Sequence, residues 1–251
     1  MRILQQTSHH MKKLLTLTVI LTAFFASCQF IGKPIKGNGN PRTESRNISS
    51  AQKIKLAGSY DVELSQGSST SLKIEADDNL LPYIETYNED GWLVIKTKEG
   101  YHLSTANQIK VTVSTDKLEA VKLAGSGNVI GKTKFTGGDY LEVGIAGSGN
   151  ASLEVNAPKV KSSIAGNGDI IISGETKTQE AEIAGNGNYR AENLKSENAE
   201  VHIAGSGYAK VDAANKLEIH IAGSGDVFYK GNPTIDQHIA GSGNIKRITE
   251  N

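Results

Sequence analysis

Cysteine, aromatic residues and net charge are all scarce in this chain, and each scarcity excludes a class of protein. The 251 residues include one cysteine and 6% aromatic residues, and 27 basic residues balance 27 acidic ones. One cysteine excludes an intrachain disulfide framework and a cysteine-based zinc site. Balanced charge lacks the basic excess typical of nucleic-acid binding, so we expect no nucleic-acid partner. Glycine, by contrast, accounts for 27 of the 251 residues, about 11% against a usual share of roughly 7%.

The first 27 residues have the pattern of an export signal. Lys12 and Lys13 precede the uncharged run 14–26, which is too short to span a bilayer comfortably but suits a signal-peptide core. The small residues Ala26 and Ser27 directly precede Cys28. This arrangement resembles the lipobox of bacterial lipoproteins, in which cleavage precedes a cysteine that is then acylated. We therefore expect residues 1–27 to be a lipoprotein signal peptide and Cys28 to be lipidated; the alternative is an ordinary secretory signal with a chance cysteine.

Met11 is an alternative start to Met1, because Met-Lys-Lys-Leu-Leu is a typical signal opening. Removing residues 1–27 takes away three basic residues and no acidic ones, which leaves 24 basic against 27 acidic residues, a net charge of −3. Residues 28–46, with Gly, Pro, Asn and charged side chains, are predicted to be a tether; the alternative is one frayed first coil of the solenoid. The membrane is then a partner of the mature protein through its N-terminal lipid anchor.

One hexapeptide recurs eight times and explains the glycine. Each copy has an aliphatic residue, Ala-Gly, Ser or Asn, Gly, and Asn or Asp; Tyr60 replaces the second glycine of the first copy and Tyr208 the last residue of the sixth. From the second copy onward the period is nearly constant, at roughly 20 residues, which is typical of repeat architectures. The aliphatic positions are Leu56, Leu123, Ile145, Ile164, Ile183, Ile203, Ile221 and Ile239.

The segments between copies alternate apolar and polar residues, as in 141–145 and 217–221. Alternation of this kind is typical of β-strands. Together with the short, regular period and the lack of any helical pattern, it predicts an all-β protein, a parallel β-solenoid whose coils turn at Gly-Asn corners. We expect corner glycines with positive φ, a hydrogen-bonded column of Asn and Asp, and an alanine in a crowded corner where nothing larger fits. Eight copies that each lead into a strand exclude a phosphate loop.

The chain is expected to form one solenoid domain over residues 47–251. Residues 121–248 carry the regular repeats. Between Leu56 and Leu123 the hexapeptide is missing, but strand-like runs occur at 60–64, 72–76, 92–97 and 109–114. Residues 47–120 are therefore predicted to form irregular N-terminal coils, because the terminal repeats of a solenoid are usually atypical.

The pattern resembles a known family, the head GIN domain of auto-transporter adhesins. The resemblance rests on the repeated Ala-Gly-Ser-Gly-Asn, on Asp77-Asp78-Asn79-Leu80-Leu81 and on Asp90-Gly91-Trp92-Leu93-Val94-Ile95. It covers roughly residues 47–248 and implies a right-handed β-solenoid in a Bacteroidetes-type lipoprotein. It also implies a cell-envelope location, which with the lipid anchor we expect to be the outer membrane, on either side. The family brings no established catalytic residues.

Three histidines directly precede the aliphatic residue of successive copies, and stacking would align them in one column. They are the equally spaced His202, His220 and His238, with Glu182 in the same place one coil earlier. Two positions upstream in these last three copies lie Glu200, Glu218 and Asp236. Imidazoles and carboxylates can bind zinc or nickel, so this strip is one candidate metal site. The alternative, which we favour, is a solvated outer face on which Glu relieves repulsion between His side chains; no metal or other cofactor is assigned.

Function follows least directly from the sequence. No nucleophile elbow, metalloprotease motif or paired catalytic carboxylate occurs, and a serine without a positioned base is an ordinary hydroxyl. The prediction is a non-enzymatic cell-envelope lipoprotein that serves as an adhesion module and binds a glycan or a surface protein. Tyr208, Glu200, Glu218 and Asp236 are its candidate binding residues. The alternatives are a structural or self-assembling envelope component and, less favoured, a β-helix carbohydrate-active enzyme.

Overall fold

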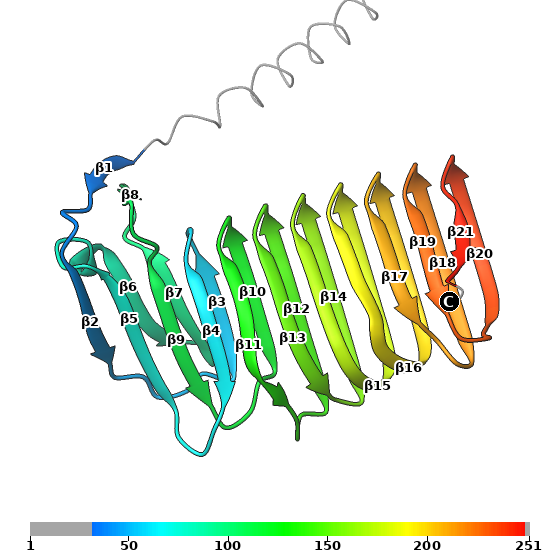
Figure 1. Ribbon diagram of the computed structural model, residues 1–251, viewed down its shortest axis with the longest axis horizontal. Coiled ribbons are helices and arrows are strands. Elements are labelled where there is room, and N and C mark those ends of the chain that lie inside the picture. The colour runs from blue at the N-terminus through cyan, green and yellow to red at the C-terminus, as the bar shows by residue number, and fades with distance from the viewer. Residues whose placement is uncertain (1–31, 249–251) are drawn as a thin grey trace, which may run out of the picture.

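The computed structural model describes residues 32–248, which form an elongated stack of β-strands (Figure 1). The strands pair in parallel from coil to coil over about seven turns, and the part of the chain so described contains one short 3₁₀ helix, η1 (Leu81–Tyr83). The predicted all-β parallel solenoid is thus confirmed. The signal peptide and the lipidation site Cys28 lie outside the described residues.

Two rows of parallel strands build the regular stack. β15 and β16 are long enough to bend through a corner, so each supplies a strand to both rows. The first row contains β10 (Ala120–Gly125), β12 (Tyr140–Gly147), β14 (Lys159–Gly166), β15 (Asp169–Gly185), β16 (Asn188–Gly205), β18 (Lys216–Gly223) and β20 (Thr234–Gly241). The second row contains β11 (Asn128–Phe135), β13 (Asn150–Asn156), β15, β16, β17 (Tyr208–Asp212), β19 (Asp226–Lys230) and β21 (Ile245–Arg247).

All eight hexapeptide copies lie in register: seven are in the first row, and the first copy is on the strand Lys53–Ala57, which pairs with β10. Leu56 pairs with Leu123, Leu123 with Ile145, and the series continues to Ile239. From Leu56 to Ile221 these aliphatic side chains are 1–3% exposed, so they form one column of the core. A core built from such thin aliphatic layers explains why the chain needs few aromatic residues.

The two glycines of each copy are needed for different reasons. Gly185 has a φ of +123°, a backbone region that favours glycine. Gly187 has no positive φ, but a Cβ at this position would lie 2.4 Å from the carbonyl oxygen of Gly168 in the previous coil. The first glycine therefore confirms the predicted corner geometry, whereas the second is required because neighbouring backbones approach too closely for a side chain.

The predicted Asn/Asp column is also present at the following corner position. Asn128 Nδ2 donates to Asp61 Oδ1 at 2.8 Å, and Asn150 Nδ2 donates to Asn128 Oδ1 at 3.0 Å. Further along, Asn188 Nδ2 donates to Asp169 Oδ1 at 2.8 Å. These side chains satisfy one another across coils and fix the register of the corners.

The N-terminal coils do not stack in chain order. β3 (Lys53–Ala57) pairs in parallel with both β10 and β7 (Trp92–Thr97). β4 (Asp61–Gln66) pairs in the same way with β11 and β9 (Lys110–Thr115). The coil formed by β3 and β4 therefore lies between a later coil and the regular repeats, as Figure 1 shows.

Antiparallel strands cover the N-terminal end of the stack. β5 (Ser71–Asp77) pairs with β9 and with β2 (Pro41–Arg46), and β6 (Ile84–Glu89) forms a hairpin with β7. β1 (Lys33–Lys36) pairs with β8 (Tyr101–Ser104). Part of the segment expected to consist of coils is thus an antiparallel cap, and the segment expected to be a tether supplies β1 and β2. Neither feature carries the hexapeptide, so the repeat gave no sign of them.

Candidate functional site

The alanine that follows each buried aliphatic residue lies on the outer surface. From Ala57 to Ala240 all eight alanines are exposed. The expectation that this alanine fills a crowded corner is therefore wrong. Successive residues of a strand point to opposite faces, so a residue next to the inward-pointing Ile or Leu must point outward.

These alanines line a shallow groove of about 870 Å³ that runs along the solenoid axis. We call it the alanine groove. It extends from Lys55 on β3 to His238 and Ala240 on β20. Its floor consists of alanine methyl groups, and the adjacent outward column, which includes Glu182 and His202, forms one side.

The predicted histidine column is confirmed and forms part of this side. His202 pairs in register with His220, and His220 with His238. The rings of His202 and His220 are stacked, with centroids 4.7 Å apart and planes within 4°. His238 lies at 6.3 Å from His220 and is tilted by 44°. Glu182 stands opposite His202 in the preceding coil.

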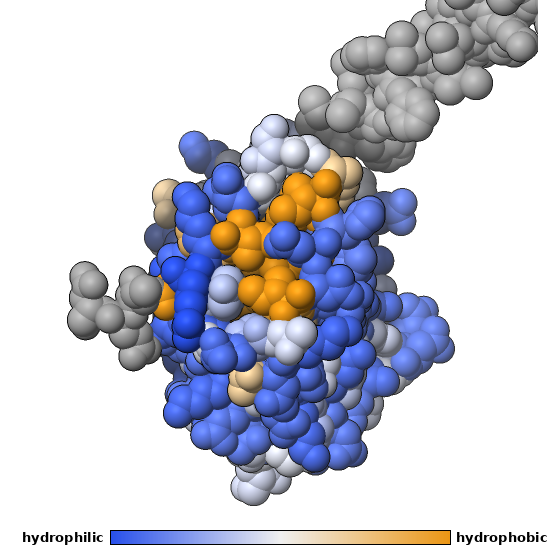
Figure 2. Space-filling model, turned by 90° about the vertical axis from the view of Figure 1, so that its right-hand side faces the viewer, coloured by the Kyte–Doolittle hydropathy of each residue, from blue (hydrophilic) through white to orange (hydrophobic). Residues whose placement is uncertain are grey.

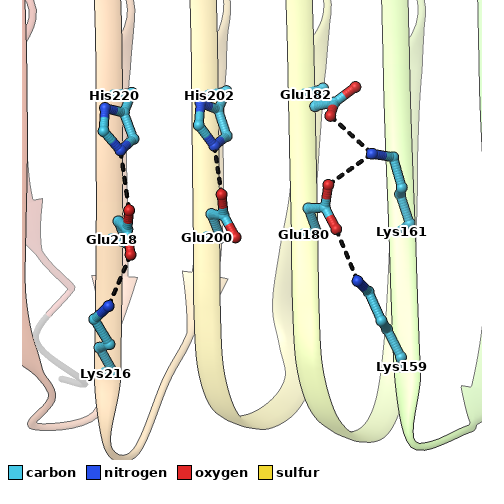
Figure 3. A network of polar contacts seen from close by, with 9 residues as sticks. All are labelled: Lys159, Lys161, Glu180, Glu182, Glu200, His202, Lys216, Glu218 and His220. Atoms are coloured by element: carbon cyan, nitrogen blue, oxygen red, sulfur yellow. Dashed lines mark hydrogen bonds and ion pairs between the residues drawn. The ribbon is translucent and has the colours of Figure 1, made fainter.

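Each of the first two histidines has a carboxylate partner on its own strand (Figure 3). His202 Nε2 lies 2.7 Å from Glu200 Oε1, and His220 Nε2 lies 3.1 Å from Glu218 Oε1. Because the two rings are parallel, their in-plane lone pairs run side by side instead of converging on one ion. Among residues 32–248, no group of three or more His, Cys, Asp or Glu has a metal-binding arrangement. The geometry therefore favours the solvated outer face over the metal strip.

Lysines form a second polar cluster on the same face, between β14 and β15. Lys161 Nζ donates to Glu180 Oε1 at 2.6 Å and to Glu182 Oε1 at 2.8 Å, and Lys159 Nζ lies 3.1 Å from Glu180 Oε2 (Figure 3). Hydrogen bonding by Lys161 holds the pKa of Glu180 below its ordinary value. The two carboxylates in turn raise the pKa of Lys161.

The lowering of a carboxyl pKa by its hydrogen-bond donors is largest at Glu218. A hydrogen bond from Lys216, at 2.7 Å, and one from His220 lower the pKa of the Glu218 carboxyl to about 2. Asp236 follows Glu218 in the column, opposite it on β20. Glu180 and Glu218 thus belong to two separate ion-paired clusters on the outer face, beside the alanine groove.

Tyr208 belongs to a different part of the surface. It pairs with Asn188 and Asp226 in the corner column, where its backbone N–H donates to Asn188 Oδ1 at 3.3 Å. Its half-buried ring meets Phe228 edge-on, with centroids 6.2 Å apart. The structure therefore separates Tyr208 from the histidine column and the groove.

Two further features were missed by sequence reasoning. Lys55 and Lys122 place their Nζ atoms 4.5 Å and 5.3 Å from the ring centroid of Trp92, at the N-terminal end of the groove. A polar cleft of about 630 Å³ opens near β8, between residues such as Tyr101 and Asn128. Each joins residues in or next to the first two copies to the segment between those copies, which lacks the hexapeptide, so no local pattern could have indicated them.

Comparison with known families identifies the chain. The profile described as "Putative auto-transporter adhesin, head GIN domain" matches residues 52–233, most of the described chain. The chain belongs to the head GIN domain family. The resemblance seen in the repeat is thereby confirmed. No curated protein matches this GIN-domain chain.

Solved structures share the fold of the GIN-domain chain. A "putative adhesin" from Bacteroides fragilis is 24% identical, with a TM-score of 0.81 over 85% of this chain and 100% of the other. A "putative lipid binding protein" from Parabacteroides distasonis is 30% identical, with a TM-score of 0.72 over 86% and 100%. A "putative adhesin" from the same organism is 24% identical, with a TM-score of 0.69 over 86% and 100%.

No helix within residues 32–248 of the GIN-domain chain has the length and apolar character needed to cross a membrane.

Proposed function

We propose that this GIN-domain chain is a non-enzymatic adhesion module of the cell envelope, anchored at the outer membrane by a lipid on Cys28. The module binds an extended glycan or protein chain in the alanine groove. The observation that carries the proposal is the continuity of the groove. Eight alanines in register span seven steps, about 34 Å at ~4.8 Å per coil.

The shape and chemistry of the groove support a long, regular ligand. Its methyl floor offers dispersion contact at every coil, while the adjacent column presents charged and polar side chains such as Lys122, Glu182 and His202. Apolar contact along the axis with polar contacts beside it is the usual division of labour in ligand grooves. A rigid sheet also loses little entropy when it binds.

The direction of the pKa shifts of Glu180 and Glu218 supports a binding role over hydrolysis at these two side chains. A glycoside hydrolase needs one carboxylic acid with a raised pKa as proton donor. Here Lys161 lowers the pKa of Glu180, and Lys216 lowers that of Glu218. Incubation of the protein with envelope glycans should therefore release no reducing sugar. If the protein released reducing sugar and the Glu218→Gln variant did not, the proposal would be contradicted.

Binding is tested by filling the groove. Ala184→Arg places a long side chain on the exposed floor, and Ala214→Arg makes the same change at an exposed position outside the lining of the groove. Binding to a glycan array and to immobilised envelope proteins should fall with Ala184→Arg and stay unchanged with Ala214→Arg. Equal binding by both variants would exclude the groove as the site.

A second candidate ligand is the acyl chain of a lipid. The floor presents alanine methyls without aromatic rings, and the relative that is 30% identical bears the name "putative lipid binding protein". Displacement of a fluorescent fatty acid, with the same two variants, tests this candidate: binding that Ala184→Arg alone abolishes would favour lipid over glycan or protein.

The anchor is tested separately. Cells that express the full chain in the presence of labelled fatty acid should acylate it, and Cys28→Ser should abolish the label and release the protein from the membrane fraction. Label that persists after this substitution would exclude Cys28 as the lipidation site.

A further inference from the structure

The last coil of the described chain leaves core residues uncovered. Ile235 and Ile239 on β20 are 36% and 38% exposed. Their partners one coil earlier, Leu217 and Ile221, are 0% and 2% exposed. Figure 2, which looks at this end of the molecule, shows an apolar patch surrounded by polar side chains.

The same coil has an open strand edge. Within residues 32–248, β20 pairs only with β18, and β21 only with β19. A strand inside a parallel sheet directs about half of its backbone groups to each neighbour. The free side of β20 therefore presents unpaired N–H and C=O groups next to exposed apolar side chains, which is a template for strand addition.

The opposite end of the stack lacks this combination. Its outer strand β2 carries Pro41, Arg42, Glu44 and Arg46 within its short length, and β6 carries Glu85 and Glu89. Proline and charged side chains are the usual devices that prevent an edge strand from pairing. In β20 the three core-facing positions are Ile235, Gln237 and Ile239, none of them charged.

We infer that β20 pairs with β20 of a second copy of this chain, in antiparallel register about a two-fold axis at Gln237. In this register Ile235 faces Ile239 of the second copy on the inner side. On the outer side Asp236 faces His238 of the second copy, so an acidic side chain meets a basic one at both ends of the pair. The strand is thus complementary to itself, and this self-complementarity favours a second copy over an unrelated partner.

A two-fold contact closes after two copies. Both uncovered coils are then buried, and the free ends of the dimer are the capped N-terminal ends, which resist further pairing. The assembly is a closed dimer and not a filament. The inference does not require the proposed ligand, because the two copies pair through the edge of β20. Of the residues at this contact, His238 also lines the C-terminal end of the alanine groove.

The oligomeric state of the chain from Gln29 onward, which contains every described residue, tests the inference. Sedimentation velocity over a wide concentration range should show a mass that doubles from monomer to dimer and then stays constant. A monomer at every concentration, or a mass that rises beyond the dimer, would overturn it.

Two sets of variants locate the contact. Gln237→Lys puts two like charges at the two-fold axis and should abolish the dimer, whereas Gln108→Lys, at an exposed loop position, should leave it unchanged. Asp236→Lys and His238→Glu should each weaken the dimer, and the double variant should restore it. A dimer that survives Gln237→Lys, or a double variant no better than the singles, would refute this register. Circular dichroism of each variant confirms that the fold is retained.

Discussion

Replacing Gly185 by valine tests the geometry of the solenoid corner. Its φ is +123°, and a Cβ would lie 2.4 Å from the carbonyl oxygen of Gly166 in the previous coil. A left-handed backbone costs an L-residue about 1–2 kcal/mol, and forcing atoms into a packed site costs about 1–3 kcal/mol. The free energy of unfolding should therefore fall by about 2–5 kcal/mol, a large part of the stability of most domains.

Two other glycines separate these contributions. Gly137 has a φ of +76° with nothing within 4 Å of its Cβ position, so Gly137→Ala should cost only the backbone share, about 1–2 kcal/mol. Gly187 has no positive φ, but its Cβ would lie 2.4 Å from Gly168 O and 2.5 Å from Ile164 Cγ2. Gly187→Ala should therefore cost only the packing share, about 1–3 kcal/mol.

Urea unfolding measures these differences as shifts of the midpoint at constant slope. Circular dichroism reports on the whole sheet, and the fluorescence of Trp92, the one tryptophan, reports on the capped end. Coincident transitions would indicate that the stack unfolds as one unit. If Gly185→Val unfolded at the same urea concentration as Gly137→Ala, the close approach between neighbouring corners would be refuted.

Three further predictions concern polar contacts. Asn188→Ala removes a donor and an acceptor from the corner column and should lower the free energy of unfolding by about 1–3 kcal/mol; no shift in urea midpoint would mean that the column contributes nothing. Tyr189→Phe leaves the buried Gln179 Oε1 without its 3.1 Å donor and should cost about 1–3 kcal/mol; an unchanged urea midpoint would refute this. NMR titration should give the Glu218 carboxyl a pKa of about 2, and Lys216→Met should raise it. Since this pKa is lowered by folding, the stabilisation by Glu218 is complete above the ordinary value of 4.5 and lost as the pH falls towards 2.

The hexapeptide was sufficient to predict the regular part of the fold, because each copy encodes its own corner. An inward aliphatic residue, a glycine with positive φ and a stacking amide each meet an identical neighbour one coil away, so local sequence also specifies the tertiary contact. The histidine column followed for the same reason. The equal spacing of His202, His220 and His238 matches the length of one coil, and the three lie in register as expected.

The N-terminal region could not be predicted in this way. The positions of its strands were visible in the alternation, but their partners lie far away along the chain: Leu56 on β3 pairs with Ile95 on β7 and with Leu123 on β10. No repeat in the sequence indicates which of these distant strands will pair with one another. The polar cleft near β8 and the contact of Lys55 with Trp92 arise from these pairings.

The alanine groove was missed for a simpler reason. Lack of space is one explanation for an invariant alanine, but the alternation that buries Ile183 places Ala184 on the opposite face. The small size of this residue therefore reflects the outer surface, where a uniform row of methyl groups keeps the groove open, and not the packing of the core.

The order of the N-terminal coils has a mechanical consequence. A solenoid stacked in chain order can be peeled from its end, one coil at a time, because each coil contacts only its neighbours. Here a force applied through residues 32–52 reaches β3, which is held between β7 and β10. To extract that strand, two ladders must break together, and the cap formed by β2 and β5 must open first. The interlocked strand thus lies at the N-terminal end of the stack, where a pull through residues 32–52 enters the fold.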